Sequence, residues 1–102
     1  MGEFKKVASV GDLQPGTSKL VEVSGKKIAL FNLGGTCYGI DDTCPHRGGP
    51  LSEGLIEGES VTCPWHGSVF NIKTGAVETS PARVGVTAYK VRVQGSDIEV
   101  EV

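Results

Sequence analysis

The clearest alternation of apolar and polar residues lies at the C-terminal end of the chain. Apolar residues recur at every second position on both sides of Gly95-Ser96, at Tyr89, Val91, Val93, Ile98, Val100 and Val102. A period of two is typical of strands with one buried and one wet face, so this segment predicts a hairpin. The phase breaks at Ala88-Tyr89, and a β-bulge near Thr87 or Ala88 would account for the break.

Shorter apolar runs earlier in the chain, separated by glycine and proline, predict more strands. They cover residues 4–9, 19–23, 27–33, 36–40, 55–57, 60–62 and 69–72, followed by a short apolar pair at 76–77. Turns are expected at Pro15-Gly16, Ser24-Gly25-Lys26 and Gly34-Gly35, whereas residues 41–54 and 78–82 read as irregular loops. No window has sustained helical periodicity. We therefore expect a single all-β domain over residues 1–102, built as stacked sheets or a partly open barrel.

Charge and composition exclude several classes of function. The formal net charge of -2 argues against a nucleic-acid binder, which would carry a basic stripe. No apolar run approaches the roughly 20 residues that a membrane span needs. The N-terminal residues lack a secretory signal, and three cysteines without such a signal do not suggest a disulfide framework. A cytoplasmic protein is expected.

The candidate chemistry is concentrated in one pattern, C-x-H followed by C-x-x-H. Both histidines and two of the three cysteines belong to it: Cys44, His46, Cys63 and His66. Thiolate and imidazole are ligands for soft and borderline metals, so the pattern predicts a metal centre. A chance arrangement of core cysteines and surface histidines is the plainest alternative. A structural zinc site is another, but common zinc motifs pair cysteine with cysteine and histidine with histidine, whereas here each loop holds one of each.

The pattern resembles the Rieske family of [2Fe-2S] proteins, and the resemblance covers nearly the whole chain, including Gly67-Ser68 after the second histidine. It implies that Cys44 and Cys63 hold one iron, and that His46 and His66 hold the other at the exposed tip of two loops. Neutral imidazoles make such a cluster easier to reduce, with potentials of about -150 to +300 mV against about -400 mV for all-cysteine ferredoxins.

Further residues are assigned supporting roles by the same resemblance. The resemblance implies that Gly48, Gly67 and Ser68 lie in the loops around the cluster. It also implies that Trp65 shields the cluster from water and that Pro81 lies in a third loop that covers it. Trp65 could equally be an ordinary packed aromatic residue. The third cysteine, Cys37, lies in a predicted strand and is expected to be a small buried core residue.

Departures from the respiratory branch of the family narrow the function. That branch has a further cysteine in each loop, and the two form a disulfide; Gly49 and Trp65 occupy those positions here. It also has a tyrosine where this chain has Phe70. Fewer hydrogen bonds to sulfur predict a potential in the low part of the Rieske range. The segments 41–46 and 63–67 are similar to the soluble ferredoxins of bacterial aromatic-ring dioxygenase systems.

The resemblance therefore implies an electron-transfer protein and no enzyme in its own right. It would carry one electron at a time from a flavin-dependent ferredoxin reductase to a terminal oxygenase, docking transiently as a monomer through the tip formed by His46 and His66. An alternative is a small Rieske subunit of a larger redox enzyme, such as assimilatory nitrite reductase. A structural zinc module is the remaining alternative.

Overall fold

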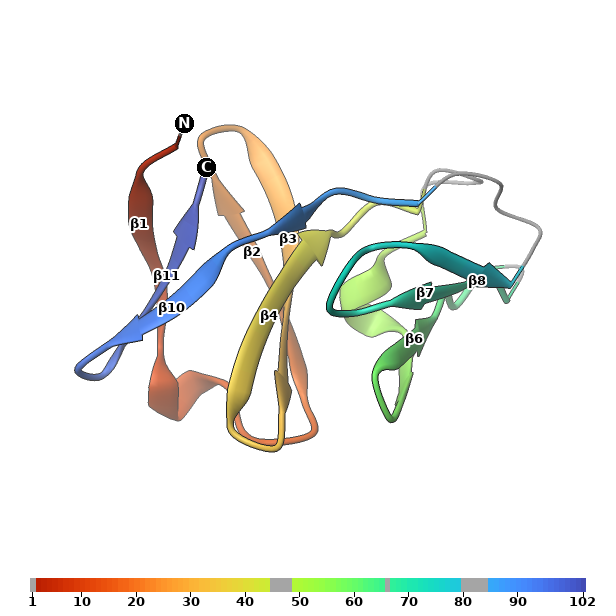
Figure 1. The fold of residues 1–102 in the computed structure, drawn as a ribbon, viewed down its shortest axis with the longest axis horizontal. Helices are drawn as coiled ribbons and strands as arrows, with labels where there is room; N and C mark the ends of the chain where they lie inside the picture. The colour runs from red at the N-terminus through yellow and green to blue at the C-terminus, as the bar shows by residue number, and fades with distance from the viewer. Residues whose placement is uncertain (1, 45–48, 66, 80–84) are drawn as a thin grey trace.

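Short antiparallel strands make up the fold (Figure 1). The computed structural model describes residues 2–44, 49–65, 67–79 and 85–102, and within these ranges there is no α-helix. The strands are β1 (Phe4–Ser9), β2 (Ser18–Val23), β3 (Lys26–Leu33), β4 (Thr36–Asp41), β5 (Leu55–Glu57), β6 (Ser60–Thr62), β7 (Val69–Asn71), β8 (Val77–Thr79), β9 (Ala88–Tyr89), β10 (Val91–Gln94) and β11 (Asp97–Glu101). Two 3-10 helices, η1 (Val10–Asp12) and η2 (Leu51–Glu53), complete the elements. The all-β prediction is confirmed.

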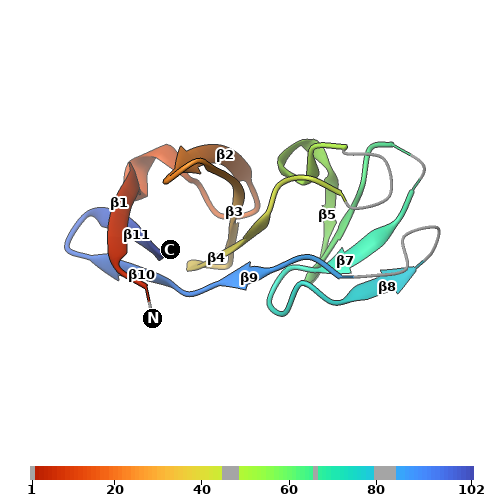
Figure 2. The ribbon, with the colours of Figure 1, turned by 90° about the horizontal axis from the view of Figure 1, so that it is seen from above.

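The strands form three sheets in layers. Their orders are β1-β11-β10, β2-β3-β4-β9 and β5-β6-β7-β8. The second sheet lies between the other two, as both views of the ribbon show (Figures 1 and 2). One hydrophobic core fills each interface, and we call them core A and core B. Core A is formed by Ala29, Phe31, Ile40, Cys44, Leu51, Val61, Cys63, Phe70 and Ile72. Core B is formed by Ala8, Leu13, Val21, Ile28, Leu30, Ile98 and Val100.

Strand β3 joins the two cores. Its central run, Ile28-Ala29-Leu30-Phe31, is fully buried. Because side chains alternate between the faces of a strand, Ala29 and Phe31 enter core A, whereas Ile28 and Leu30 enter core B. A strand covered on both faces needs apolar residues at every position, which explains why this is the longest apolar run in the chain.

The predicted turns are present, with one difference in length. Ser24 and Gly25 alone connect β2 to β3, with φ of +53° and +75°, and Val23 pairs directly with Lys26. Lys26 therefore belongs to the strand and not to the turn. Two left-handed residues suit the twist of a two-residue hairpin. At Pro15-Gly16, the Thr17 amide donates to the Gln14 carbonyl at 3.1 Å.

The break in the C-terminal alternation is a change of sheet. Ala88 and Tyr89 pair with β4 in the middle sheet, whereas Val91 begins the pairing with β11 in the outer sheet. The register of neither pairing shifts there, so the expected bulge at Thr87 or Ala88 was wrong.

Two further expectations need correction. Val93 is 47% exposed although it shares the apolar phase of β10, because it lies near the hairpin turn at the sheet's end. Residues 77–79 form β8, where an irregular loop was expected from 78 onward. This strand pairs with β7, and the Glu78 carboxylate accepts hydrogen bonds from Asn71 on β7 and from Ser60 on β6, the next strand of the sheet. Cross-strand contacts therefore order a segment with little apolar pattern of its own.

Candidate metal centre

Cys44 stands at the start of the first predicted ligand loop, just beyond β4. Its backbone amide donates to the Gly49 carbonyl at 2.9 Å, and Thr43 forms an isolated antiparallel bridge with Pro50. The Leu51 amide then donates to the Asp42 carbonyl at 2.7 Å. These contacts close the base of the loop like a short hairpin, with Cys44 on one side and Gly49 on the other.

Cys63 has the equivalent position in the second loop, just beyond β6. Its backbone amide donates to the Ser68 carbonyl at 2.7 Å. Gly67 precedes Ser68 with a φ of +74°, a conformation that glycine adopts without steric cost. The amide of each cysteine therefore closes its own loop, and both cysteines are fixed to the ends of paired strands.

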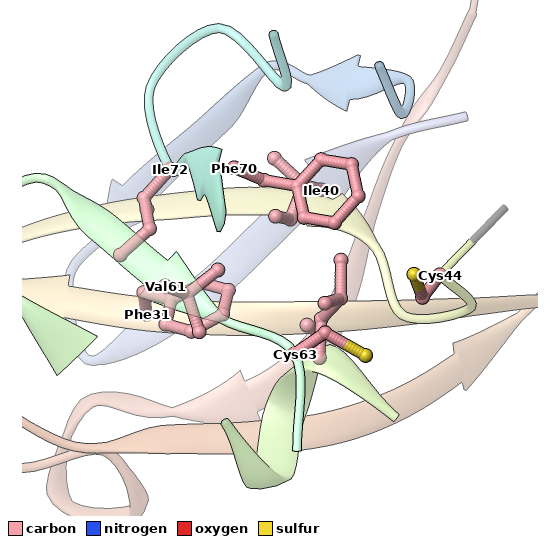
Figure 3. Packing of buried hydrophobic residues seen from close by; sticks show 9 residues of the cluster. Phe31, Ile40, Cys44, Val61, Cys63, Phe70 and Ile72 are labelled. Carbon is pink, nitrogen blue, oxygen red and sulfur yellow. The ribbon is translucent and has the colours of Figure 1, made fainter. Parts of the chain in front are cut away.

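The two cysteines meet at one end of core A (Figure 3). Cys44 is 1% exposed and Cys63 is 2% exposed. Burial raises the pKa of the Cys63 thiol, a backbone hydrogen bond from Trp65 lowers it, and the adjacent Cys44 side chain raises it further. The last cause requires the two thiols to be neighbours. Tertiary folding thus unites one cysteine from each predicted loop in a dry site.

Gly49 leaves space for the Cys63 sulfur. A Cβ atom added to Gly49 would lie 2.7 Å from Cys63 Sγ and 3.2 Å from Trp65 Cβ. The first distance is too short for any residue larger than glycine unless the sulfur moves. The second makes Gly49 and Trp65 neighbours, and these are the positions of the two bracing cysteines in the respiratory branch. Both observations agree with the alignment that the resemblance implies.

The contribution of the Trp65 backbone was missed by sequence reasoning. Its amide donates a hydrogen bond to the Cys63 thiol, and such bonds stabilise added negative charge on sulfur. Pro64 has no amide hydrogen, so Trp65 supplies the first available donor after Cys63, and the Cys-Pro-Trp order could have indicated this. Trp65 is 50% exposed, so it is not an aromatic residue packed in the core.

The remaining described candidates are buried around the cysteines, and Cys37 is elsewhere. Ser68 and Phe70 are fully buried, with Phe70 inside core A. Cys37 lies in β4, paired with Asn32, and packs at the edge of core B. A small buried core residue was expected, whereas Cys37 is only partly buried where it packs against core B, away from the cysteine pair.

Several predicted site residues lie outside the described residues, namely His46, Gly48, His66 and Pro81. Consistent with this, the described ranges contain no group of three or more histidine, cysteine and acidic side chains that could hold a metal ion. The pairing of both histidines with the second iron therefore stays a prediction.

The described half of the site fits a [2Fe-2S] cluster. Two neighbouring cysteines would supply, as thiolates, the soft anionic ligands that iron–sulfur clusters require. Gly49 keeps space free beside one sulfur, and the Trp65 amide directs a donor at it. Core A excludes water behind the pair.

No helix within the described ranges has the length and apolar character to cross a membrane.

Comparison with known proteins assigns the chain to a family. Residues 3–90 match the model of the Rieske [2Fe-2S] domain. Ferredoxin CarAc from Metapseudomonas resinovorans is 36% identical over 96 residues, which cover 93% of this chain and 90% of the relative. The 3-phenylpropionate/cinnamic acid dioxygenase ferredoxin subunit from Shigella boydii is 41% identical over 93 residues, covering 90% and 87%.

A solved structure agrees in both fold and sequence. In a complex of reduced oxygenase and oxidized ferredoxin in carbazole 1,9a-dioxygenase, the matching chain superposes with a TM-score of 0.89. It is 35% identical, and the match covers 96% of this chain and 92% of the other. The cofactor is accordingly a [2Fe-2S] cluster, which excludes the zinc interpretation. The chain belongs to the Rieske [2Fe-2S] family.

Proposed function

We propose that this chain is a one-electron carrier that delivers electrons to the terminal oxygenase of a bacterial aromatic-ring dioxygenase system. The cluster supplies a one-electron couple when it is bound. The observation that carries the proposal is the buried pair of Cys44 and Cys63 at the bases of two loops, in a chain that is similar along most of its length to ferredoxin components of dioxygenases.

The ligand assignment belongs to the same proposal. Cys44 and Cys63 hold the inner iron, and His46 and His66 hold the outer iron. The pairing of the thiols in core A supports the first half of this assignment. The C-x-H and C-x-x-H spacings support the second half, because each histidine is two or three residues from its cysteine. Gly67 and Ser68 close the second loop, and Gly48 and Pro81 are assigned to the first loop and to a third covering segment.

The partners follow from the chemistry of the tip and from the relatives. An outer iron held by imidazoles at a loop tip gives a short path for the electron into a docked protein. The solved relative is in complex with an oxygenase, which supports the same class of acceptor here. We assign the donor as a flavin-dependent ferredoxin reductase that docks transiently at the same tip, and the carrier as a monomer.

A single domain in the cytoplasm is the setting that fits these features. Strand β3 contributes to both cores, so the three sheets are expected to fold as one unit over residues 1–102. None of the three cysteines is joined in a disulfide, which suits a reducing compartment.

The test is anaerobic purification of the full chain with analysis of its metal content. We expect two irons and two sulfides per chain and a Rieske-type EPR signal after reduction. The oxidized protein should accept an electron from a flavin-dependent reductase and release it to a dioxygenase oxygenase. A folded, colourless sample with stoichiometric zinc would contradict the proposal. Isolation only within a stable complex of a larger enzyme would favour the subunit alternative.

A further inference from the structure

A nearly buried carboxylate lies two residues before the first cysteine. Asp42 is 4% exposed, although aspartate is almost never buried without partners. Its Oδ1 atom accepts a hydrogen bond from the Ser52 backbone amide at 2.8 Å. Ser52 is the central residue of η2, so the carboxylate holds this short helix against the end of β4.

The segment 51–54, which is η2 with its C-cap Gly54, contacts the residues that precede both cysteines. At one end, the Leu51 amide donates to the Asp42 carbonyl at 2.7 Å, and the Leu51 side chain is fully buried in core A with both cysteines. At the other end, Gly54 packs so closely on β6 that an added Cβ would collide with the Thr62 carbonyl. Thr62 immediately precedes Cys63. The segment 51–54 therefore links the residues that immediately precede Cys44 and Cys63.

A second hydrogen bond holds the same residue of η2, Ser52. The Ser18 hydroxyl on β2 donates to the Ser52 carbonyl at 2.5 Å. Ser52 is thus held by its amide to Asp42 and by its carbonyl to Ser18. A displacement of Ser52 would strain these two hydrogen bonds.

From these contacts, and resting on the proposed function, we infer that Asp42 is a positioning residue for the cysteine pair. Its carboxylate holds η2 as a spacer between Cys44 and Cys63, and so fixes the separation of the two thiolates on the inner iron. The adjacent Asp41 does not share this role. It accepts from the Tyr89 hydroxyl at 2.6 Å and from the Thr87 amide at 3.3 Å, on the side of β4 that faces β9.

The test compares Asp42→Ala with Asp42→Asn in the iron-loaded full chain. Alanine removes the acceptor, whereas the asparagine side-chain oxygen can still accept from Ser52. We expect Asp42→Ala to shift the g-values of the reduced cluster and to accelerate cluster loss to a chelator roughly tenfold, the factor implied by losing one hydrogen bond to a charged group. Asp42→Asn should restore the wild-type lineshape and bring the loss rate to within about twofold, since its neutral hydrogen bond retains most of the restraint.

Glu53→Gln is the matched control, because it removes one negative charge from the exposed side of the same helix. It should leave both readouts unchanged. Wild-type g-values and loss rate in Asp42→Ala would overturn the inference. An Asp42→Asn protein that behaves like Asp42→Ala would also overturn it, because the effect would then follow charge instead of the hydrogen bond.

If Asp42→Ala yields no folded protein, Asp42→Glu tests the positioning role of Asp42 instead. It keeps the charge and lengthens the side chain by one methylene, so it should displace η2 and change the g-values. An unchanged spectrum would overturn the positioning role. The wild-type sample separates this inference from the proposed function: absence of any [2Fe-2S] signal there contradicts the function, whereas a normal signal that no Asp42 variant alters contradicts only the inference.

Discussion

Gly49 lies against the sulfur of Cys63, on the opposite ligand loop. A Cβ atom at Gly49 would be 2.7 Å from Cys63 Sγ and 3.1 Å from Trp65 Cγ. The two loops therefore approach each other at a point where one has no side chain and the other has a ligand. The respiratory branch joins the loops covalently through cysteines at positions 49 and 65. Here the same two positions are joined by packing of an exposed indole over a glycine.

Substitution of Gly49 by alanine should impair cluster assembly. The added methyl must displace the Cys63 sulfur or the Trp65 side chain, and overpacking of this kind typically costs about 1–3 kcal/mol. We expect the iron content of purified Gly49→Ala to fall well below that of wild type. Gly11→Ala is the matched control, since a Cβ at Gly11 meets nothing within 4 Å and its φ is not in the left-handed region. Equal iron content in both variants would contradict the tight contact.

Replacement of His66 by cysteine tests the ligand assignment. A thiolate adds negative charge to the outer iron, so the reduction potential should move toward the all-cysteine range of about -400 mV, unless the cluster fails to assemble. The measurement is a redox titration followed by EPR. An assembled cluster with the wild-type potential would remove His66 from the ligand set.

The third cysteine should be dispensable for the cluster. Cys37 packs at the edge of core B, on the other side of the middle sheet from core A. Cys37→Ser should therefore retain the visible and EPR spectra of the wild type, while Cys63→Ser should lose or strongly alter them. Bleaching of the Cys37→Ser protein would show that the cysteines have been wrongly sorted.

Alkaline pH should weaken the junction between β4 and β9. Burial, a hydrogen bond to Asp41 and the charge of Asp41 together raise the pKa of Tyr89 from 10.0 to about 12. The folded state thus favours the protonated phenol. Its contribution to stability is complete below pH 10, where the unfolded chain is also protonated, and is lost as the pH rises toward 12.

Tyr89→Phe removes this contribution. It should lower the free energy of unfolding at pH 8 by about 1 kcal/mol, the typical value of a partly exposed hydrogen bond. The difference between variant and wild type should shrink between pH 10 and pH 12. Thermal unfolding followed by circular dichroism at several pH values measures both effects. A constant difference across this interval would mean that the phenol does not titrate as described.

The ligand loops were predictable from the sequence because the motif that marks each one lies within a few consecutive residues. The spacings of Cys44, His46, Cys63 and His66 identify a Rieske motif before any fold is known, and the absence of cysteine at position 49 distinguishes the branch. Strand positions were predictable for the same reason, since alternation and glycine-marked turns depend on near neighbours. The apolar run of β3 also agreed with its burial on both faces.

The roles of Asp41 and Asp42 were decided only by the tertiary structure. The two are chemically identical neighbours, yet Asp41 ends β4 and accepts a hydrogen bond from Tyr89, whereas Asp42 follows the strand and accepts one from Ser52 in η2. Likewise, the phase break near Tyr89 became a change of sheet because β4 and β11 offer two different partners. The sequence alone determined the ligand motif and most of the strands, because both depend on residue types at short spacing. Tertiary structure decided which polar groups hold the cysteines together, because burial and pairing depend on segments far apart in the chain.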